Sequence, residues 1–187
     1  MEEVSSNVYE KCPIYENENF LLSLVEKSDT EDLLECYSDP VSAKFFNSDN
    51  CTSDFVYKTL EEMGDCIDFW LAEYKNRYYV RFSVIDKKTE KAIGTIEFFA
   101  KEENFEIGKV GLLRLDLSSS YENERSISDL FVIIEQEFPK AFGIENIITK
   151  AIPEAFSRIA ALKSAGYTGL SDERINKYDH YYIKHNL

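Results

Sequence analysis

The sequence has little glycine and no long apolar run. Only 7 glycines occur in 187 residues. Glycine lets a backbone loop approach a phosphate closely, so few positions in this chain suit such a loop. The longest clearly aliphatic and aromatic run, residues 130–134, is far too short to cross a bilayer. The acidic start of the chain also lacks the apolar segment of a secretory signal. We therefore expect a cytoplasmic protein that does not enter a membrane.

The cysteines do not form a metal-binding pattern. Cys12, Cys36, Cys51 and Cys66 include no Cys-x-x-Cys pair and have no histidine nearby at the spacing of a metal site. In a chain of this length without a secretory signal, such cysteines are typical of reduced thiols. The sequence predicts no metal site.

Basic residues are also scarce, because 21 lysines and arginines face 35 aspartates and glutamates and leave a net charge of −14. So acidic a surface repels nucleic acid and anionic membranes and suits a cationic partner. No repeat or linker divides the chain, and its length fits one domain over residues 1–187. Residues 1–17 are polar, and we expect them to be loosely held.

Hydrophobic periodicity predicts alternating strands and helices. Predicted helices cover residues 31–37, 54–75, 126–143 and 153–166, and predicted strands cover residues 20–25, 80–85, 92–99, 110–117, 147–152, 167–170 and 179–184. The 126–143 helix has Ser126 and Asp129 as a capping box, and Gly143 as its C-terminal cap. This order predicts an α/β (α+β) fold, a mixed sheet with helices packed on it.

Five short motifs follow one another in a specific order. They are Glu-Asn-Phe-Leu-Leu at 18–22, Asp-Pro-Val-Ser-Ala-Lys-Phe-Phe at 39–46, Ile-Gly-Thr-Ile at 93–96, Gly-Tyr at 166–167 and Asp-His-Tyr-Tyr at 179–182. In this order they resemble the GNAT superfamily of acyl-CoA-dependent N-acyltransferases. The resemblance covers about residues 18–185 and is strongest to the branch that acetylates the N-termini of ribosomal proteins and related amines. It implies a mixed, mostly antiparallel sheet with helices on both faces.

The resemblance also implies acetyl-CoA as co-substrate, with its pyrophosphate at a helix N-terminus in a Gln/Arg-x-x-Gly-x-Gly/Ala loop. Backbone N–H groups would hold the phosphates there. In this chain Glu122 stands at the Gln/Arg position, Arg125 at the first Gly and Ile127 at the second small position. The implied CoA-binding residues around this helix start are Asn123, Arg125, Ser126, Ile127 and Ser128.

Two arginines have two interpretations each. Arg125 could pair with a phosphate, or it could be an exposed arginine that pairs with Glu122 or Glu124. The branch usually has Asn-x-x-Ser in the following helix, and Ala155 and Arg158 stand at those positions. Arg158 could contact phosphate, or it could lie on the helix surface.

Catalysis on such a fold needs a polarised carbonyl, a base and an acid. An N–H group near Leu115 and Leu117 would polarise the carbonyl. Glu97 is the first candidate for the base because it interrupts an apolar strand, and Asp116 is the second. Either could instead be a strand carboxylate that faces water. Tyr121 is a candidate acid, although a tyrosine in such a place could equally serve in packing.

The sequence is thus consistent with two functions. The first is an N-acetyltransferase, monomeric or homodimeric, that moves an acetyl group from acetyl-CoA to a primary amine. The acceptor would be a peptide N-terminus or a small amine, cationic if the acidic surface selects it. The alternative is a catalytically inactive GNAT scaffold that binds a ligand or a protein, which the changed loop and the missing Asn/Ser pair favour.

Overall fold

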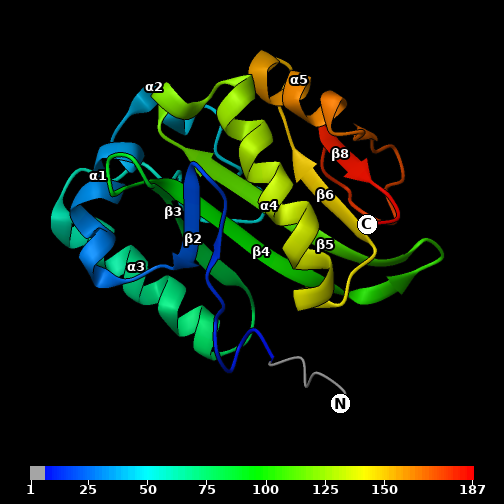
Figure 1. Cartoon of the computed structure of the whole chain (residues 1–187), viewed down its shortest axis with the longest axis horizontal. Coiled ribbons are helices and arrows are strands. Elements are labelled where there is room, and N and C mark those ends of the chain that lie inside the picture. Colours follow the sequence, from blue (N-terminus) through cyan, green and yellow to red (C-terminus); the bar gives the residue numbers. More distant parts are fainter. Residues whose placement is uncertain (1–6) are drawn as a thin grey trace.

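The computed structural model describes residues 7–187, and its strands all belong to one sheet. The strands are β1 (Tyr15–Glu16), β2 (Phe20–Leu24), β3 (Val80–Asp86), β4 (Lys91–Phe105), β5 (Gly108–Leu117), β6 (Asn146–Lys150), β7 (Thr168–Gly169) and β8 (Tyr181–Lys184). Their order across the sheet is β1-β2-β3-β4-β5-β6-β8-β7 (Figure 1). Only the β5–β6 pair is parallel among these described strands.

Helices cover both faces of this sheet. They are α1 (Thr30–Tyr37), α2 (Pro40–Ala43), α3 (Leu60–Lys75), α4 (Glu124–Phe142) and α5 (Phe156–Ser164), with short 3-10 turns η1 (Lys27–Asp29) and η2 (Ser119–Tyr121). Figure 1 shows α4 lying across one face of the sheet, with α3 on the other. The prediction of a mostly antiparallel sheet with helices on both faces is confirmed.

The first core layer lies between the sheet and α4. Apolar side chains alternate along β3 and β5 and point toward this helix, because successive residues of a strand face opposite sides. They meet the buried stripe of α4, which consists of Ile127, Leu130, Phe131, Ile134 and Phe138. Burial of each large side chain contributes about 1.5–3 kcal/mol, so this layer fixes the position of α4 on the sheet.

The second core layer lies between the opposite face and helices α1 and α3. Its buried members include Leu33, Tyr37, Met63, Ile67 and Trp70. The prediction that α3 begins at residue 54 is wrong, because Phe55 has a left-handed φ of 57°. The helix begins at Leu60, after a capping box in which Thr59 Oγ1 accepts from Glu62 N at 3.1 Å.

Helix α4 begins earlier than its sequence pattern predicts. Asn123 is the N-cap, and its Oδ1 accepts a hydrogen bond from Ser126 N at 3.0 Å. The predicted capping box at Ser126 is therefore wrong. The far end is as predicted, because Gly143 takes the left-handed conformation (φ 61°) that ends the helix. The N-terminus of α4 thus follows closely after η2.

The first residues were expected to be loosely held. Residues 1–6 lie outside the described part, but residues 7–17 are packed against the domain. Tyr74 Oη donates to Val8 O at 2.8 Å, Asn17 Nδ2 donates to Asp129 O at 2.9 Å, and Tyr15 is buried in β1. The expectation is wrong for this stretch because buried aromatic and aliphatic side chains anchor it.

Some features are absent from the described residues. No helix within residues 7–187 is long and apolar enough to span a bilayer. The same residues contain no group of three histidine, cysteine, aspartate or glutamate side chains that could hold a metal ion. The four cysteines are free thiols.

Candidate active site

The sheet opens between β5 and β6. Their parallel pairing runs from Val110–Asn146 to Leu113–Thr149, whereas β5 continues to Leu117. Strand N–H groups alternate in direction, and Ser118 N donates to Ile93 O beside β4 at 2.8 Å. The N–H groups of Leu115 and Leu117 therefore point away from β4, into the gap beside β6. These are the groups that the sequence led us to expect opposite a thioester carbonyl.

The N-terminus of α4 lies at the open end of this gap, because only η2 separates it from β5. Asn123 caps Ser126 N, and Ile127 N donates to Asn123 O, so these two expected N–H groups are already engaged. Ser128 lies further inside the helical ladder. The N–H groups of Glu124 and Arg125 have no partner among residues 7–187. An anion at this end would meet those two groups and the positive end of the helix dipole.

The side chain of Arg125 is available to a ligand. It is exposed and forms no ion pair within the described part of the chain. The side chain of Ile127 is fully buried in the core and cannot contact a phosphate. The sequence assigned CoA binding at this helix start to backbone N–H groups, and that assignment stays a prediction.

Arg158 is buried rather than on the helix surface, with 3% of its area exposed. It forms an ion pair with Glu122, and its Nη1 donates to Phe45 O at 3.0 Å. Burial raises the pKa of the Glu122 carboxyl, and the charge of Arg158 only partly opposes this. Glu122 is thus not a free charge that would repel a phosphate. The Nε atom of Arg158 has no hydrogen-bond partner in the described residues.

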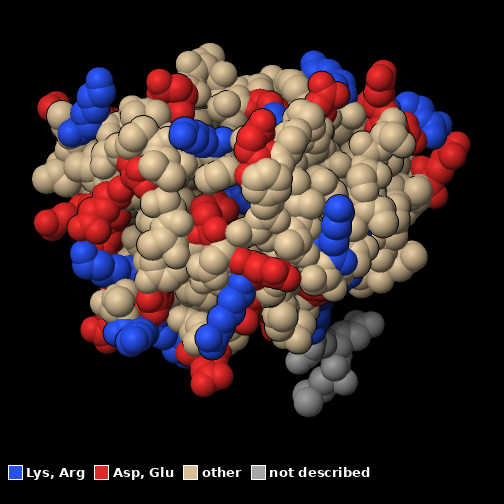
Figure 2. All heavy atoms as spheres, turned by 90° about the horizontal axis from the view of Figure 1, so that it is seen from above, with Lys and Arg blue, Asp and Glu red and all other residues tan. Residues whose placement is uncertain are grey.

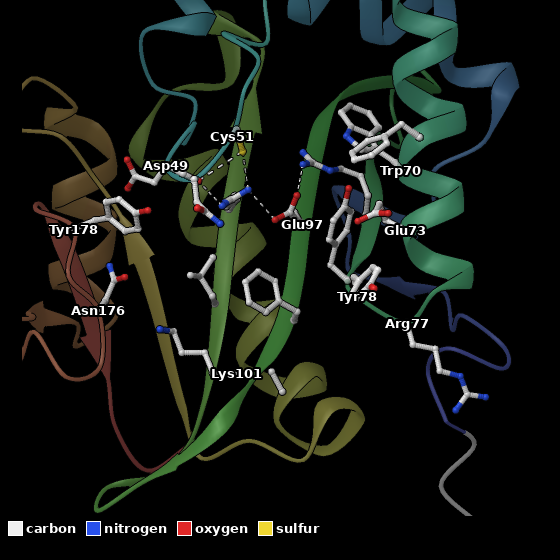
Figure 3. A pocket seen from close by; sticks show the side chains of 18 of the residues that line it. Asp49, Cys51, Trp70, Glu73, Arg77, Tyr78, Glu97, Lys101, Asn176 and Tyr178 are labelled. Carbon is white, nitrogen blue, oxygen red and sulfur yellow. Dashed lines mark hydrogen bonds and ion pairs between the residues drawn. The ribbon is translucent and has the colours of Figure 1, made fainter.

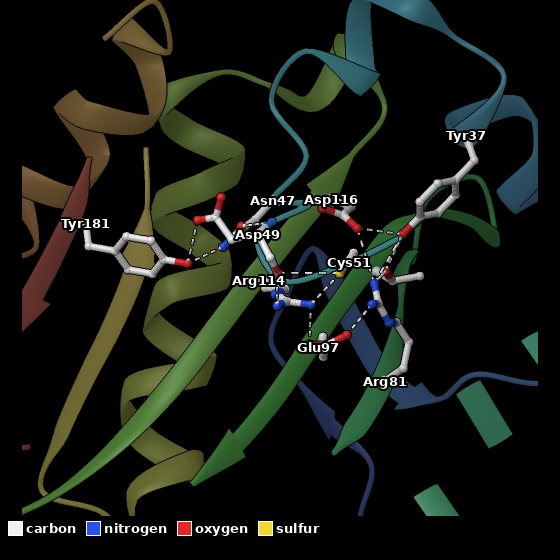
Figure 4. Close-up of polar contacts among 10 residues, drawn as sticks. Tyr37, Asn47, Asp49, Cys51, Arg81, Glu97, Arg114, Asp116 and Tyr181 are labelled. Atoms are coloured by element: carbon white, nitrogen blue, oxygen red, sulfur yellow. Dashed lines mark hydrogen bonds and ion pairs between the residues drawn. The ribbon is translucent and has the colours of Figure 1, made fainter. Parts of the chain in front are cut away.

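Charged and polar side chains form a buried cluster on the α1–α3 face of the sheet. Cross-strand register aligns Arg81, Glu97 and Arg114 in one row across β3, β4 and β5. A neighbouring row contains Thr95 and Asp116. Figure 4 shows these side chains pointing toward one another.

Glu97 uses both of its carboxylate oxygens within this cluster. Oε2 pairs with Arg81 Nη2, and Oε1 lies 3.1 Å from Arg114 Nη1. Only 2% of the residue is exposed, so the interpretation of Glu97 as a strand carboxylate that faces water is wrong. Two guanidinium groups therefore occupy the positions from which Glu97 would accept a proton.

Asp116 uses only one of its oxygens. Oδ2 accepts from Tyr37 Oη at 2.8 Å and from Arg81 Nη1 at 3.2 Å, whereas Oδ1 is buried without a partner in the described residues. Burial raises the pKa of the Asp116 carboxyl, and Arg81 and Tyr37 partly oppose that rise. A water-facing position is again excluded, since the residue is 3% exposed. Asp116 thus has a free oxygen and a raised pKa, which suit a general base.

Arg81 connects the two carboxylates. Burial alone would lower the pKa of its guanidinium, but Glu97, Tyr37 and Asp116 raise it above the ordinary value. The guanidinium also lies 4.3 Å from the ring centre of Trp70, a cation–π contact with α3. It stays charged, and it holds the cluster together.

Tyr121 does not join this cluster. Its hydroxyl donates to Asp86 Oδ2 at 2.5 Å, at the end of β3, and its ring packs on Phe20 at 6.3 Å. The structure therefore assigns Tyr121 to packing between β2, β3 and η2, and its proton is committed to Asp86. The suggested role as catalytic acid is not supported.

A large groove of about 1760 Å³ lies over the cluster, between α3 and residues 173–178. Arg81, Glu97 and Arg114 lie in its floor. Figure 3 shows Trp70 and Tyr78 on one side and Asn176 and Tyr178 on the other. The groove exceeds the 300–1,000 Å³ typical of small-molecule pockets, so it has room for an extended acceptor.

Residues 45–51, here called the crossing segment, pass over the end of the gap. Asn47 Nδ2 donates to Tyr181 Oη at 2.8 Å, Lys150 Nζ lies 2.7 Å from Asp49 Oδ1, and Arg114 Nη2 donates to Asp49 O at 2.7 Å. The segment thus ties β5, β6 and β8 together (Figure 4). Figure 2, which views the molecule from the α2 and α5 side, shows acidic and basic side chains mixed over this end.

Sequence reasoning missed Tyr37, Thr95, Arg81 and Arg114 as members of the site. A usable signal existed, because each strand carries a polar residue on the face opposite its core residues. Antiparallel pairing of β3 with β4 and of β4 with β5 places Arg81 opposite Glu97 and Glu97 opposite Arg114. Opposite charges at paired positions of neighbouring strands interact favourably, so this register predicts a row of ion pairs.

Comparison with known proteins identifies the fold. No known family model matches the chain. It is similar to the uncharacterized N-acetyltransferase YoaA of Bacillus subtilis (strain 168), with 21% identity over 165 residues, 88% of this chain and 78% of YoaA. It is also similar in structure to an acetyltransferase (GNAT family) from Bacillus anthracis, with a TM-score of 0.66, 16% identity and coverage of 92% and 98% of the two chains.

Two further structures similar to this chain contain cofactors. The ribosomal L7/L12 alpha-N-protein acetyltransferase RimL, in complex with coenzyme A, has a TM-score of 0.71 and 11% identity, and covers 93% of this chain and 98% of its own. The microcin C7 self-immunity acetyltransferase MccE, in complex with acetyl-CoA and AMP, has a TM-score of 0.67 and 13% identity. The match covers 90% of this chain and 93% of the MccE chain. The chain therefore has the fold of the GNAT acetyltransferases, and the resemblance found in its motifs is confirmed.

Proposed function

We propose that this chain, which has the GNAT fold, is a cytoplasmic N-acetyltransferase that moves an acetyl group from acetyl-CoA to a primary amine. One observation carries the proposal: the β5–β6 gap combines the strand N–H groups of Leu115 and Leu117 with the free N-terminus of α4 at its open end. The acceptor would be a peptide N-terminus or a small amine. RimL, by its name, acts on a ribosomal protein.

The residues around the gap fit acetyl-CoA. The N–H groups of Glu124 and Arg125 and the exposed Arg125 side chain suit a pyrophosphate. Arg158 Nε, an unpartnered buried donor, suits a carbonyl of the pantetheine arm. Acetyl-CoA supplies an activated acetyl thioester. The Leu115 and Leu117 N–H groups would polarise its carbonyl oxygen.

The acceptor amine would enter from the groove side of the sheet. Asp116 Oδ1 takes one proton from the ammonium group, which leaves a lone pair on nitrogen. A nitrogen–carbon bond forms, the carbon–sulfur bond breaks, and the sulfur takes the electron pair together with the second amine proton. The products are an N-acetylated amine and free CoA thiol. Asp116 is preferred to Glu97 as the base because only Asp116 has an unoccupied oxygen.

A specific observation favours the inactive scaffold as a second candidate. Arg158 is held by both Glu122 and Phe45 O, so α5, the loop before α4 and the crossing segment are joined at the end of the gap. If these contacts do not open, acetyl-CoA cannot pass. The gap would then be a structural remnant.

A transfer assay distinguishes the two candidates. Purified protein is incubated with acetyl-CoA and a panel of spermidine, a basic peptide and an alanine-initiated peptide, and free thiol and acetylated product are both measured. We expect turnover with at least one amine, and a loss of about 100-fold or more in kcat for Asp116→Asn. Asp68→Asn, on the exposed side of α3, is the matched control and should leave kcat unchanged.

Absence of turnover with every amine would favour the scaffold. Turnover that survives in Asp116→Asn would instead keep the enzyme and remove Asp116 as its base.

A further inference from the structure

We propose that Tyr37 is a positioning residue for catalysis: its hydroxyl, together with Arg81, holds one oxygen of Asp116 and leaves the other oxygen to take the proton of the acceptor amine. The inference rests on the proposed function. It assigns a role to the end of α1, which neither the sequence motifs nor the comparisons mark as part of the site.

The hydrogen-bond geometry determines which group donates to which. Tyr37 Oη lies 2.8 Å from Asp116 Oδ2 and 2.7 Å from Thr95 Oγ1. A phenol has a single hydrogen to donate, and an ionised carboxylate can only accept. Tyr37 therefore donates to Asp116 and accepts from Thr95, whose oxygen in turn accepts from Arg81 Nη1 at 3.0 Å. The chain of donors from Arg81 through Thr95 and Tyr37 ends on Asp116 Oδ2.

Neighbouring aromatic rings fix the Tyr37 ring independently of its hydroxyl. Phe46, Trp70 and Tyr57 lie 4.9, 5.6 and 6.0 Å from it, measured between ring centres. Tyr37 is fully buried, so the hydroxyl cannot exchange its partner for bulk water. Removal of the hydroxyl alone should preserve the packing of α1 while it takes away one of the two hydrogen bonds to Asp116 Oδ2.

Several other charged or titratable groups surround Asp116. Arg81 comes from β3, Glu97 from β4, Arg158 from α5 and Glu122 from the loop before α4; Cys36 lies beside Tyr37 on α1. Arg81 and Arg158 favour the ionised carboxylate, whereas Glu97 and Glu122 disfavour it. Tyr37 is the neutral donor among them, so its removal changes the hydrogen bonding without changing the net charge of the cluster.

The Tyr37→Phe substitution should raise the pKa of the Asp116 carboxyl. The Tyr37 hydrogen bond lowers the pKa of the Asp116 carboxyl, so its loss raises that pKa further. A base acts only when it is ionised, and the acidic limb of kcat/KM follows its pKa. In Tyr37→Phe this limb moves to higher pH, and kcat at neutral pH falls about 10-fold to 100-fold.

The experiment combines the pH profile with a direct titration of Asp116. kcat/KM is measured against pH with acetyl-CoA and spermidine, or with the panel amine that turns over fastest. The carboxyl carbon of Asp116 is followed by ¹³C NMR in the protein alone and assigned by its loss in Asp116→Asn. Tyr74→Phe is the matched control, because Tyr74 also donates one hydrogen bond, to Val8 O at 2.8 Å, but lies away from Asp116.

The expected result is a shift of both the NMR titration and the acidic limb to higher pH in Tyr37→Phe, and no shift in Tyr74→Phe. In the Asp116→Asn background, Tyr37→Phe should have no further effect on kcat. An equal loss of rate at every pH with an unmoved titration would overturn the proposal, because that pattern indicates a purely structural role.

Failure of the proposed function gives a different pattern. If no amine is acetylated by the unmodified protein, the role of Tyr37 in catalysis is overturned together with the enzyme. The NMR titration would still report whether Tyr37 controls the ionisation of Asp116.

Discussion

At the scale of single residues, Arg81 compensates the charge of two buried carboxylates. Its guanidinium contacts both Glu97 and Asp116, and all three residues are at most 3% exposed. Removal of one partner from a buried ion pair leaves a carboxylate without compensation, which costs more than the pair contributes when intact. The site therefore couples the stability of the fold to the ionisation of the proposed base.

We predict that Arg81→Met destabilises the protein by about 3–5 kcal/mol, because two carboxylates lose a cationic partner in a dry environment. Urea unfolding measures the effect. Arg174→Met is the control, since Arg174 is exposed and within residues 7–187 forms a surface ion pair with Asp172, and it should leave the free energy of unfolding nearly unchanged. A loss below about 1 kcal/mol for Arg81→Met would show that the cluster is not a charge-compensated unit.

Sequence alone ranked Glu97 before Asp116 as the candidate base, which is the reverse of the order that we propose from the structure. The difference between them is the number of free oxygens, and that number depends on Arg81 and Arg114 from other strands. A pattern within one strand gives the face of each residue but not its cross-strand partner. The exposed state of Arg125 and the burial of Arg158 likewise depend on how α4 and α5 pack, which local periodicity does not contain.

At the scale of elements, the end of β5 is held in place by a close approach of β4. Gly94 lies opposite Leu117, and a Cβ atom at this position would be 2.1 Å from Asp116 O and 2.8 Å from Leu117 Cα. Both contacts are with backbone, so no side-chain rotation can relieve them. Glycine is therefore required where β4 supports the strand that carries Asp116.

We predict that Gly94→Ala destabilises the protein by about 2 kcal/mol or more, because the added methyl group must displace the backbone of β5. The same displacement should lower the acetylation rate, since it moves Asp116 and the Leu117 N–H group. Gly169→Ala is the control, because a Cβ there meets nothing within 4 Å. An equal loss of thermal stability in Gly94→Ala and Gly169→Ala would show that the approach of β4 to β5 does not require glycine at position 94.

The sequence predicted best those elements whose hydrophobic residues recur most regularly. Helix α4 was predicted with its buried stripe, because five apolar residues recur at helical spacing over its whole length. The start of α3 was placed too early, since residues 54–59 continue the apolar pattern although Phe55 has a left-handed backbone. Strand β1 was missed because two residues carry no periodic signal.

At the scale of the whole molecule, we propose that the two substrates approach from opposite sides of the sheet. In this proposal the phosphates bind at the N-terminus of α4, and the amine enters through the groove beside α3. The gap between β5 and β6 connects the two sides, and Asp116 lies beside it. The crossing segment covers this connection, and we propose that opening of its contacts with Lys150 and Arg158 admits the substrates.

We propose that the altered loop before α4 still binds acetyl-CoA, and calorimetric titration of the protein with acetyl-CoA measures this binding. We predict binding with a Kd on the order of micromolar, weakened about 10-fold or more by Arg125→Glu and unchanged by Arg174→Glu. Absence of both binding heat and thermal stabilisation at millimolar acetyl-CoA would show that the loop does not bind acetyl-CoA and would leave the GNAT fold here as a scaffold.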